Sequence, residues 1–181
     1  ITGMSPFEAM TLSFGTAGTG GFGVLNSSIG SYSVASQAVI TIFMILFGIN
    51  FNVYYLLRVK KPMEACKHEE MRYYLGIIMI AVILITVNIR DSFSSLMEAF
   101  HHAAFQVASI ITTTGYSTAD FNLWPEFSRF ILVLLMFVGA CAGSTGGGIK
   151  VSRVIIMMKL VKNELSYLIH PKRVRQIHFE R

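Results

Sequence analysis

The sequence predicts an all-α integral membrane protein in which one unit, a spanning helix, a short re-entrant pore helix and a second spanning helix, occurs twice. Three observations predict it. The 181 residues are 53% hydrophobic and only 14% charged, with a mean hydropathy of +0.57, which leaves too little polar surface for a soluble domain. The apolar residues form long uncharged blocks. Two glycine-rich polar segments recur at a fixed spacing.

The uncharged blocks set the number of expected spans. Residues 34–57 and 73–89 are near the roughly 20 apolar residues that cross a bilayer core. A third block, 130–149, is interrupted by glycines, which predicts a broken helix. Lysines and arginines gather at 58–72 and 159–181, so the positive-inside rule places both segments in the cytoplasm. These bases favour contact with anionic membrane lipid over nucleic acid.

A repeat relates GTAGTGGFGVLN at 15–26 to IITTTGYSTADF at 110–121. Internal repeats take precedence over local motifs as clues to a fold. The residue numbers of the matched positions differ by 94 throughout: Thr19 matches Thr113, Gly21 matches Gly115, and Phe22 matches Tyr116.

Each polar segment follows a predicted helix start. Ser5 with Glu8, and Ser95 with Glu98, both fit the Ser-x-x-Glu capping box. The helices that begin there reach the polar segments after roughly 12–17 residues, too few to cross a bilayer. We therefore expect two re-entrant helices that enter from the outside and stop near the membrane centre.

The first copy is expected at 1–61, with a pore helix at 5–17, a filter loop at 18–24 and a spanning helix at 34–58. Residues 62–72 are expected to form a cytoplasmic linker. Because this copy has no opening span and the chain has no initiator Met, we expect a segment of a longer protein.

The second copy is expected to be complete, at 73–161. The parts of the second copy are a span at 73–90, a pore helix at 95–111, a filter loop at 112–118, and a broken span at 126–161 with an intramembrane loop at 143–149. After it, residues 162–181 are expected to form a basic cytoplasmic tail.

The polar segments have the composition of a cation filter. Irregular backbone at membrane depth is tolerated only where it lines water or ions. Glycines permit the left-handed backbone that turns successive carbonyls to one side, and a ring of neutral oxygens suits a weakly hydrated monovalent cation. The run Thr113-Thr114-Gly115-Tyr116-Ser117 resembles the T-V-G-Y-G filter of potassium channels. The expected filter residues, which bind K⁺, are Thr19, Gly20, Gly21, Phe22, Thr113, Thr114, Gly115 and Tyr116.

Two features near the filter keep alternative interpretations. The two polar segments also fit Gly-rich external turns. Asp120, just beyond the second segment, either concentrates cations at the mouth or caps a local turn.

A second polar interruption, ACAGSTGGGIK at 140–150, lies within the last apolar block. It is not a Walker A loop, because Ile149 separates Gly148 from Lys150. Consecutive glycines disfavour a helix, and a cation on the pathway repels K⁺, so the segment is interpreted as a gate; a helix-packing patch of small residues is the alternative. At the matching positions 48–50, the first copy is expected to remain helical. The expected gate residues are Gly143, Ser144, Thr145, Gly146, Gly147, Gly148 and Lys150.

These motifs, with GACAGSTGGGIKVSRVI and NELSYLIHPKRV, resemble the Trk/Ktr/HKT superfamily of potassium transporters, and within it the bacterial TrkH-like potassium uptake subunits. The resemblance implies four helix–pore-helix–helix repeats around one pore, of which this chain resembles the second and third. It implies K⁺ permeation with some Na⁺ and Rb⁺ passage, no covalent cofactor, a bacterial inner-membrane location, a homodimer, and a cytosolic nucleotide-binding regulatory subunit (TrkA-like). By analogy, Gly21 and Gly115 are the key filter glycines and 143–150 the gate.

Two rival functions fit parts of the sequence. A membrane-embedded enzyme acting on lipid or polyprenyl phosphates would hold phosphate with the GSTGGGIK segment, but the sequence offers no convincing nucleophile or general acid. A purely structural subunit leaves the repeated loops unexplained. His101 and His102 are expected to be hydrogen-bonded helix residues rather than metal ligands, so no enzyme is expected.

Overall fold

The computed structural model describes residues 3–169, and within that range it contains helices and no strand, which confirms the all-α prediction. The α-helices are α1 (Pro6–Ala17), α2 (Val34–Phe47), α3 (Phe51–Arg58), α4 (Pro62–Lys67), α5 (Glu69–Ile89), α6 (Leu96–Ile111), α7 (Glu126–Val138) and α8 (Val151–Ile169). Short 3₁₀ turns, η1 (Arg90–Ser92) and η2 (Phe121–Leu123), follow α5 and precede α7.

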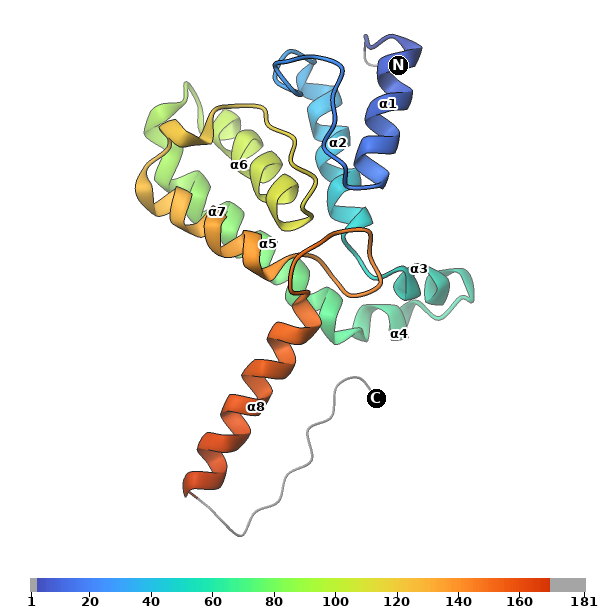
Figure 1. Ribbon diagram of the computed structural model, residues 1–181, viewed down its shortest axis with the longest axis vertical. Helices are drawn as coiled ribbons and strands as arrows, with labels where there is room; N and C mark the ends of the chain where they lie inside the picture. The colour runs from blue at the N-terminus through green and yellow to red at the C-terminus, as the bar shows by residue number, and fades with distance from the viewer. Residues whose placement is uncertain (1–2, 170–181) are drawn as a thin grey trace.

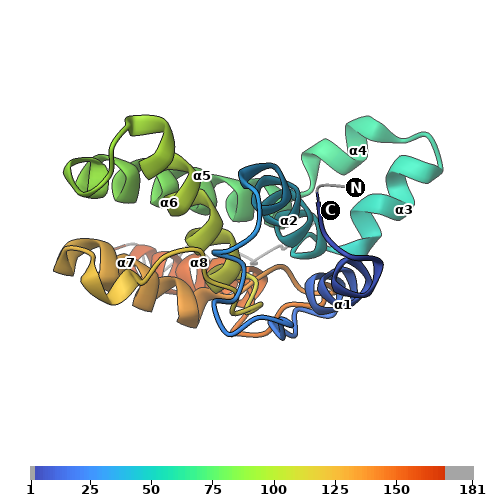
Figure 2. The same ribbon diagram turned by 90° about the horizontal axis from the view of Figure 1, so that it is seen from above.

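Helix α6 occupies the centre of the packing. It contacts α2 on one side and α5 and α7 on the other (Figures 1 and 2). Its residues Ala99, Ala103 and Val107 are buried in one apolar cluster with α5 and α7, whereas Phe105 and Ala108 are buried in a second cluster with α1 and α2. This short helix is therefore apolar on two sides and is enclosed along its second half, whereas Leu96, Met97 and Phe100 near its start are exposed.

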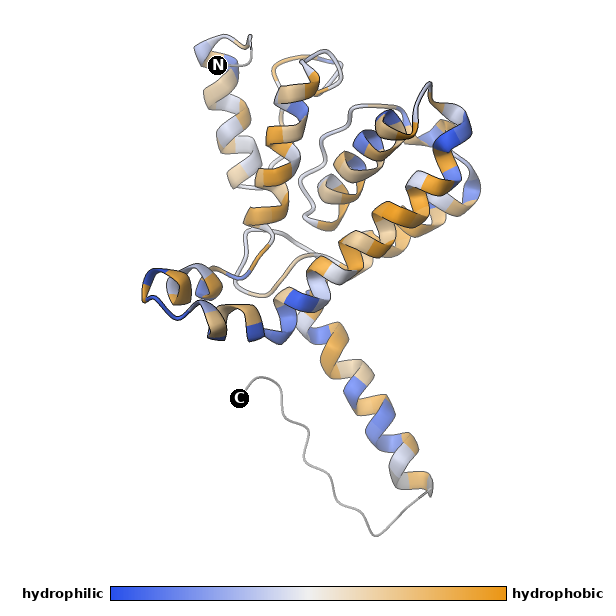
Figure 3. Cartoon of the chain, turned by 180° about the vertical axis from the view of Figure 1, so that it is seen from behind, coloured by the Kyte–Doolittle hydropathy of each residue, from blue (hydrophilic) through white to orange (hydrophobic). Residues whose placement is uncertain are grey.

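The outer faces of α2, α5 and α7 are apolar and exposed (Figure 3). Soluble monomers rarely expose such wide apolar surfaces, which are expected for helices that face lipid. By length and composition, α5 with its 3₁₀ extension is long and apolar enough to cross a membrane, and α2 with α3 counts as a second candidate only if the bent pair is one span. The exposed large side chains include Met79, Ile80, Ile83, Val87, Phe130, Met136 and Phe137.

Of the two expected capping boxes, the first is complete and the second is only half formed. The hydroxyl of Ser5 accepts from the N–H of Glu8, and the Glu8 carboxylate accepts from the N–H of Ser5, a complete box that also lowers the pKa of Glu8. The hydroxyl of Ser95 likewise accepts from the N–H of Glu98. The Glu98 carboxylate instead accepts from the N–H of Ser94, so the second box is only half formed.

The prediction of one spanning helix over 34–58 is wrong, because α2 and α3 meet at an angle of 89°. Gly48 ends α2, and Asn50 caps α3 by accepting a hydrogen bond from the N–H of Asn52. A Cβ on Gly48 would overlap the hydroxyl of Tyr74, so only glycine lets the chain turn against α5 here. The expectation that only the second copy breaks its helix is therefore also wrong.

The last carbonyl oxygens of α2 accept hydrogen bonds from groups outside the helix. Helix ends leave four carbonyls without intrahelical partners, and an unpaired buried carbonyl is costly. Distant groups reach each of these oxygens: the hydroxyl of Tyr74 donates to the carbonyl of Ile45 (3.2 Å), that of Tyr54 to Leu46 (2.6 Å), that of Thr145 to Phe47 (3.4 Å), and the N–H of Cys141 to Gly48 (3.0 Å).

Three other expected boundaries also move. Residues 62–67 of the expected linker form α4, and the span expected from residue 73 begins at Glu69, where two glutamates in the first turn favour a helix start. The break in the last span runs from 139 to 150 rather than 143–149, because α7 ends where Gly139 adopts φ +70°. Helix α8 continues to Ile169, and the rest of the basic tail lies outside the described residues.

Candidate functional site

The two filter loops, residues 18–24 and 112–118, begin with the same hydrogen bonds. In each loop the first three backbone N–H groups fold back onto the last carbonyls of the preceding pore helix. The bonds run from Gly18 to Phe14, Thr19 to Thr16 and Gly20 to Gly15 in the first loop, and from Thr112 to Ala108, Thr113 to Ile110 and Thr114 to Ser109 in the second. The sequence repeat is therefore a structural repeat.

The backbone of both loops alternates in the same way. Thr19 and Gly21 have φ of +49° and +69°, and Thr113 and Gly115 have φ of +58° and +89°. Positive φ at alternate residues turns consecutive carbonyls toward one side of the chain. Within residues 3–169, the carbonyl oxygens of 19–21 and 113–115 accept no backbone hydrogen bond, so six carbonyl oxygens are left without a backbone donor.

The loops also touch each other. A Cβ on Gly21 would overlap the carbonyl oxygen of Thr114, whereas a Cβ on Gly115 would meet nothing within 4 Å. The two filter glycines therefore share a backbone conformation but have different surroundings.

Tyr116 and Phe22 match in the repeat but differ in environment. The Tyr116 side chain is 0% exposed, and its hydroxyl lies 3.5 Å from the carbonyl of Leu12 and 3.4 Å from that of Phe22. Gly15 makes this possible, because a Cβ there would overlap the Tyr116 hydroxyl. The Phe22 ring is 81% exposed. The Tyr116 side chain thus connects the second loop to the first pore helix, α1.

Sequence reasoning missed the groups that support the second loop. Ser109, fully buried in α6, accepts from the N–H of Thr114 with its carbonyl and donates from its hydroxyl to the carbonyl of Tyr116 (2.6 Å). On the outer side, the hydroxyl of Ser28 accepts from the N–H of Ser117 (3.2 Å). A lone serine at the end of an apolar helix was the available signal for Ser109.

The remaining polar candidates have structural partners. His101 hydrogen-bonds to Gln37 and His102 to Thr118, and in the described part of the chain no group of three or more His, Cys, Asp or Glu side chains could hold a metal ion. The Asp120 carboxylate accepts from the N–H of Asn122 and caps η2, which confirms the local-turn interpretation. Arg90 and Asp91 form an ion pair at the end of α5 (3.4 Å).

The segment between α7 and α8, residues 139–150, contains the loop expected to lie in the membrane and is called the intramembrane loop; it lies directly beneath both filter loops (Figure 1). The Thr19 hydroxyl donates to the carbonyl of Thr145 (3.1 Å), and the Thr113 hydroxyl accepts from the N–H of Gly147 (2.7 Å). A Cβ on Gly146 would lie 3.0 Å from the carbonyl oxygen of Thr112. The loop therefore contacts Thr19 and Thr113, which occupy matching positions in the two copies.

The intramembrane loop is also bound to the break between α2 and α3. The N–H of Phe51 donates to the carbonyl of Gly143 (3.1 Å), and the N–H of Cys141 donates to that of Gly48. The ammonium of Lys150 donates to the carbonyl of Gly146 inside the loop. The two breaks, at matching positions of the repeat, thus pair with one another.

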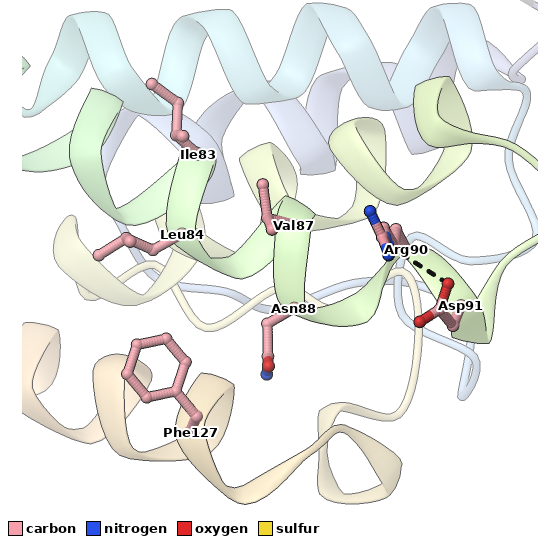
Figure 4. A pocket seen from close by; sticks show the side chains of 7 residues that line it. All are labelled: Ile83, Leu84, Val87, Asn88, Arg90, Asp91 and Phe127. Atoms are coloured by element: carbon pink, nitrogen blue, oxygen red, sulfur yellow. Dashed lines mark ion pairs between the residues drawn. The ribbon is translucent and has the colours of Figure 1, made fainter.

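An open groove of about 430 Å³ lies on the outer faces of α5 and α7 (Figure 4). Ile83, Leu84, Val87 and Phe127 form its apolar walls, and the Arg90–Asp91 pair lies at one end. None of the expected filter or gate residues lines it, so it is separate from the candidate site.

Comparisons with known proteins agree with one another. The family model TrkH, a cation transport protein, matches residues 2–181. The Trk system potassium uptake protein TrkH of Escherichia coli (strain K12) is 34% identical over 181 residues, covering 98% of this chain and 38% of that protein. The TrkH of Halomonas elongata is 35% identical over 175 residues, covering 95% of this chain and 36% of that protein.

A solved structure is also similar to this one. The crystal structure of the potassium transporter TrkH from Vibrio parahaemolyticus matches with a TM-score of 0.92 and 33% identity. The match covers 98% of this chain and 39% of that chain. The chain thus spans less than two fifths of the length of these relatives.

Proposed function

Because this chain belongs to the TrkH family of cation transport proteins, we propose that it supplies two of the filter loops through which a potassium uptake protein conducts K⁺. The observation that supports this most is the shared conformation of the loops, with positive φ at alternate residues and six carbonyl oxygens left available. Neutral carbonyl oxygens replace the hydration shell of K⁺ at low cost. The relatives themselves are named potassium uptake proteins.

The filter residues of this proposal are the eight expected from the sequence, with divided roles. Thr19, Gly20 and Gly21 of the first loop, and Thr113, Thr114 and Gly115 of the second, offer carbonyl oxygens. The aromatic residue that follows each set holds the loop rather than the ion: Tyr116 through its buried hydroxyl, and Phe22 through its backbone carbonyl.

We assign the gate to the intramembrane loop, including Gly143, Ser144, Gly148 and Lys150. Its contacts with Thr19 and Thr113 support a closed state in which the loop blocks the inner end of the filter. The rival phosphate-binding role has no such support, because the groups that would hold phosphate are occupied: the Lys150 ammonium by the carbonyl of Gly146, and the Gly147 N–H by the hydroxyl of Thr113.

Family membership extends the proposal to location and partners. We place the protein in the bacterial inner membrane, with 58–72 and 159–181 on the cytoplasmic side. In agreement with this topology, α3, α4 and α8 lie at the end of the molecule that is away from the N-terminus of α1 (Figure 1). A homodimer, contact with membrane lipid and a cytosolic nucleotide-binding regulatory subunit belong to the same proposal.

The test is K⁺ uptake by the full-length protein in cells that lack their own uptake systems. Wild type should restore growth in low K⁺, and Gly115→Ser should lose preference for K⁺ over Na⁺. Gly76→Ser, in the middle of α5 with open space around it, is the control and should behave as wild type. No K⁺ uptake by wild type, or identical behaviour of both variants, would refute the proposal.

A further inference from the structure

Glu70 is a buried carboxylate that the filter and gate residues above do not include. Its side chain is 1% exposed, and it lies in the first turn of α5, in the segment expected from the sequence to be a cytoplasmic linker. We propose that Glu70 is a positioning residue that clamps the base of the intramembrane loop and so keeps the loop beneath the filter. The proposal rests on the gate assigned above.

One oxygen of Glu70 joins the two ends of the loop. Its Oε1 accepts hydrogen bonds from the N–H of Ala142 (2.7 Å) and the N–H of Ser152 (3.0 Å). Its Oε2 lies 3.5 Å from the side-chain nitrogen of Asn50, which caps α3. A single side chain thus connects the start of the loop, the start of α8 and the break between α2 and α3.

A carboxylate suits this position better than a neutral side chain. Ser152 is the second residue of α8, so its N–H is one of the groups that the helix cannot satisfy itself. The positive end of the α8 dipole favours a negative charge there. Hydrogen bonds to an ionised acceptor are stronger than those to a neutral one, and the three donors together compensate the burial of the charge.

The clamp acts on the filter through the loop. Thr145 and Gly147, which hydrogen-bond to Thr19 and Thr113 of the two filter loops, lie between the two residues that Glu70 holds. Weakening the base therefore frees the residues that contact the filter without altering the filter loops themselves. We expect the closed state to lose stability while the ion preference of the pore is retained.

The experiment compares Glu70→Gln with Glu69→Gln in the full-length protein. Both changes remove one negative charge from the first turn of α5, but Glu69 pairs with Lys159 of α8 (2.7 Å), which lies outside the loop. The reporter is Cys141, whose buried side chain precedes Ala142. Other reactive cysteines, beginning with the exposed Cys66, are replaced by serine. The reaction of Cys141 with a thiol reagent added from the cytoplasmic side is followed over time.

Glu70→Gln should raise the rate of Cys141 modification about tenfold, the factor expected when the two hydrogen bonds to a charged oxygen become weaker bonds to a neutral one. It should also raise basal K⁺ flux with an unchanged K⁺-to-Na⁺ ratio. Glu69→Gln should change neither. A general loss of structure would lower the K⁺-to-Na⁺ ratio as well, and that outcome would overturn the clamp.

Equal modification rates in the two variants would also overturn it. If Glu70→Gln does not reach the membrane, Glu70→Asp compared with Glu69→Asp supplies the same measurement, since aspartate keeps the charge but is one methylene too short to reach both N–H groups. If wild type moves no K⁺, the transport proposal fails, while the Cys141 rates still decide whether Glu70 holds the loop.

Discussion

Replacing Gly21 by alanine should damage the filter more than the same change at Gly115, although both glycines have positive φ. The left-handed conformation costs an alanine roughly 1–2 kcal/mol at either site. At Gly21 the new Cβ also overlaps the carbonyl oxygen of Thr114, and relieving such an overlap costs typically about 1–3 kcal/mol. The total is about 2–5 kcal/mol at Gly21 against about 1–2 at Gly115.

The helical Gly76 provides the matched control. A Cβ there meets nothing within 4 Å, as at Gly115, but its backbone is helical, so alanine should stabilise it by roughly 0.5–1 kcal/mol. Initial rates of K⁺ and Na⁺ uptake are measured for the three alanine variants of the full-length protein.

The three variants should form an ordered series. Gly76→Ala should match wild type, Gly115→Ala should lower K⁺ uptake, and Gly21→Ala should lower it further and abolish the preference for K⁺. If Gly21→Ala is no worse than Gly115→Ala, the two loops do not touch as the structure shows. If both filter variants match Gly76→Ala, the left-handed conformation is irrelevant to conduction.

Two further predictions concern the parts on either side of the filter carbonyls. Removing residues 143–148 should raise K⁺ flux, because the segment contacts Thr19 and Thr113 from below; unchanged flux would exclude the loop as a gate. Ser109→Ala should lower K⁺ selectivity and destabilise the protein by about 1–3 kcal/mol, since the Tyr116 carbonyl loses its buried donor. In thermal unfolding, Ser13→Ala, which removes an exposed helix serine, should have little effect, and equal effects would contradict the role of Ser109.

Features with a local signal could be predicted from the sequence. The two repeated loops are predictable because Thr, Gly and an aromatic residue recur at a constant spacing, and the helices before them because Ser5 and Ser95 precede short apolar runs. The structure adds that the match extends to backbone hydrogen bonds and φ values, which sequence letters do not encode.

Features that depend on distant partners could not be predicted. Gly48 alone in an apolar run is compatible with a helix, and the break there is stabilised by Tyr54, Tyr74 and Thr145, which lie elsewhere in the sequence. Glu70 resembled the other charged residues around it until folding placed the two ends of the intramembrane loop against it. In both cases tertiary hydrogen bonds override the local pattern.

The central claim, that the filter carbonyls bind dehydrated K⁺, is tested most directly by ion-dependent thermal stability of the purified full-length protein. An ion that binds only the folded state stabilises it by RT ln(1 + [ion]/Kd), which is about 2.7 kcal/mol at 100 times the dissociation constant. Unfolding is measured in KCl, RbCl and NaCl at equal ionic strength. The midpoint temperature should be higher in KCl and RbCl than in NaCl, and Gly21→Ala but not Gly76→Ala should remove the difference. Equal midpoints for wild type in all three salts, or a difference that survives in Gly21→Ala, would contradict the claim.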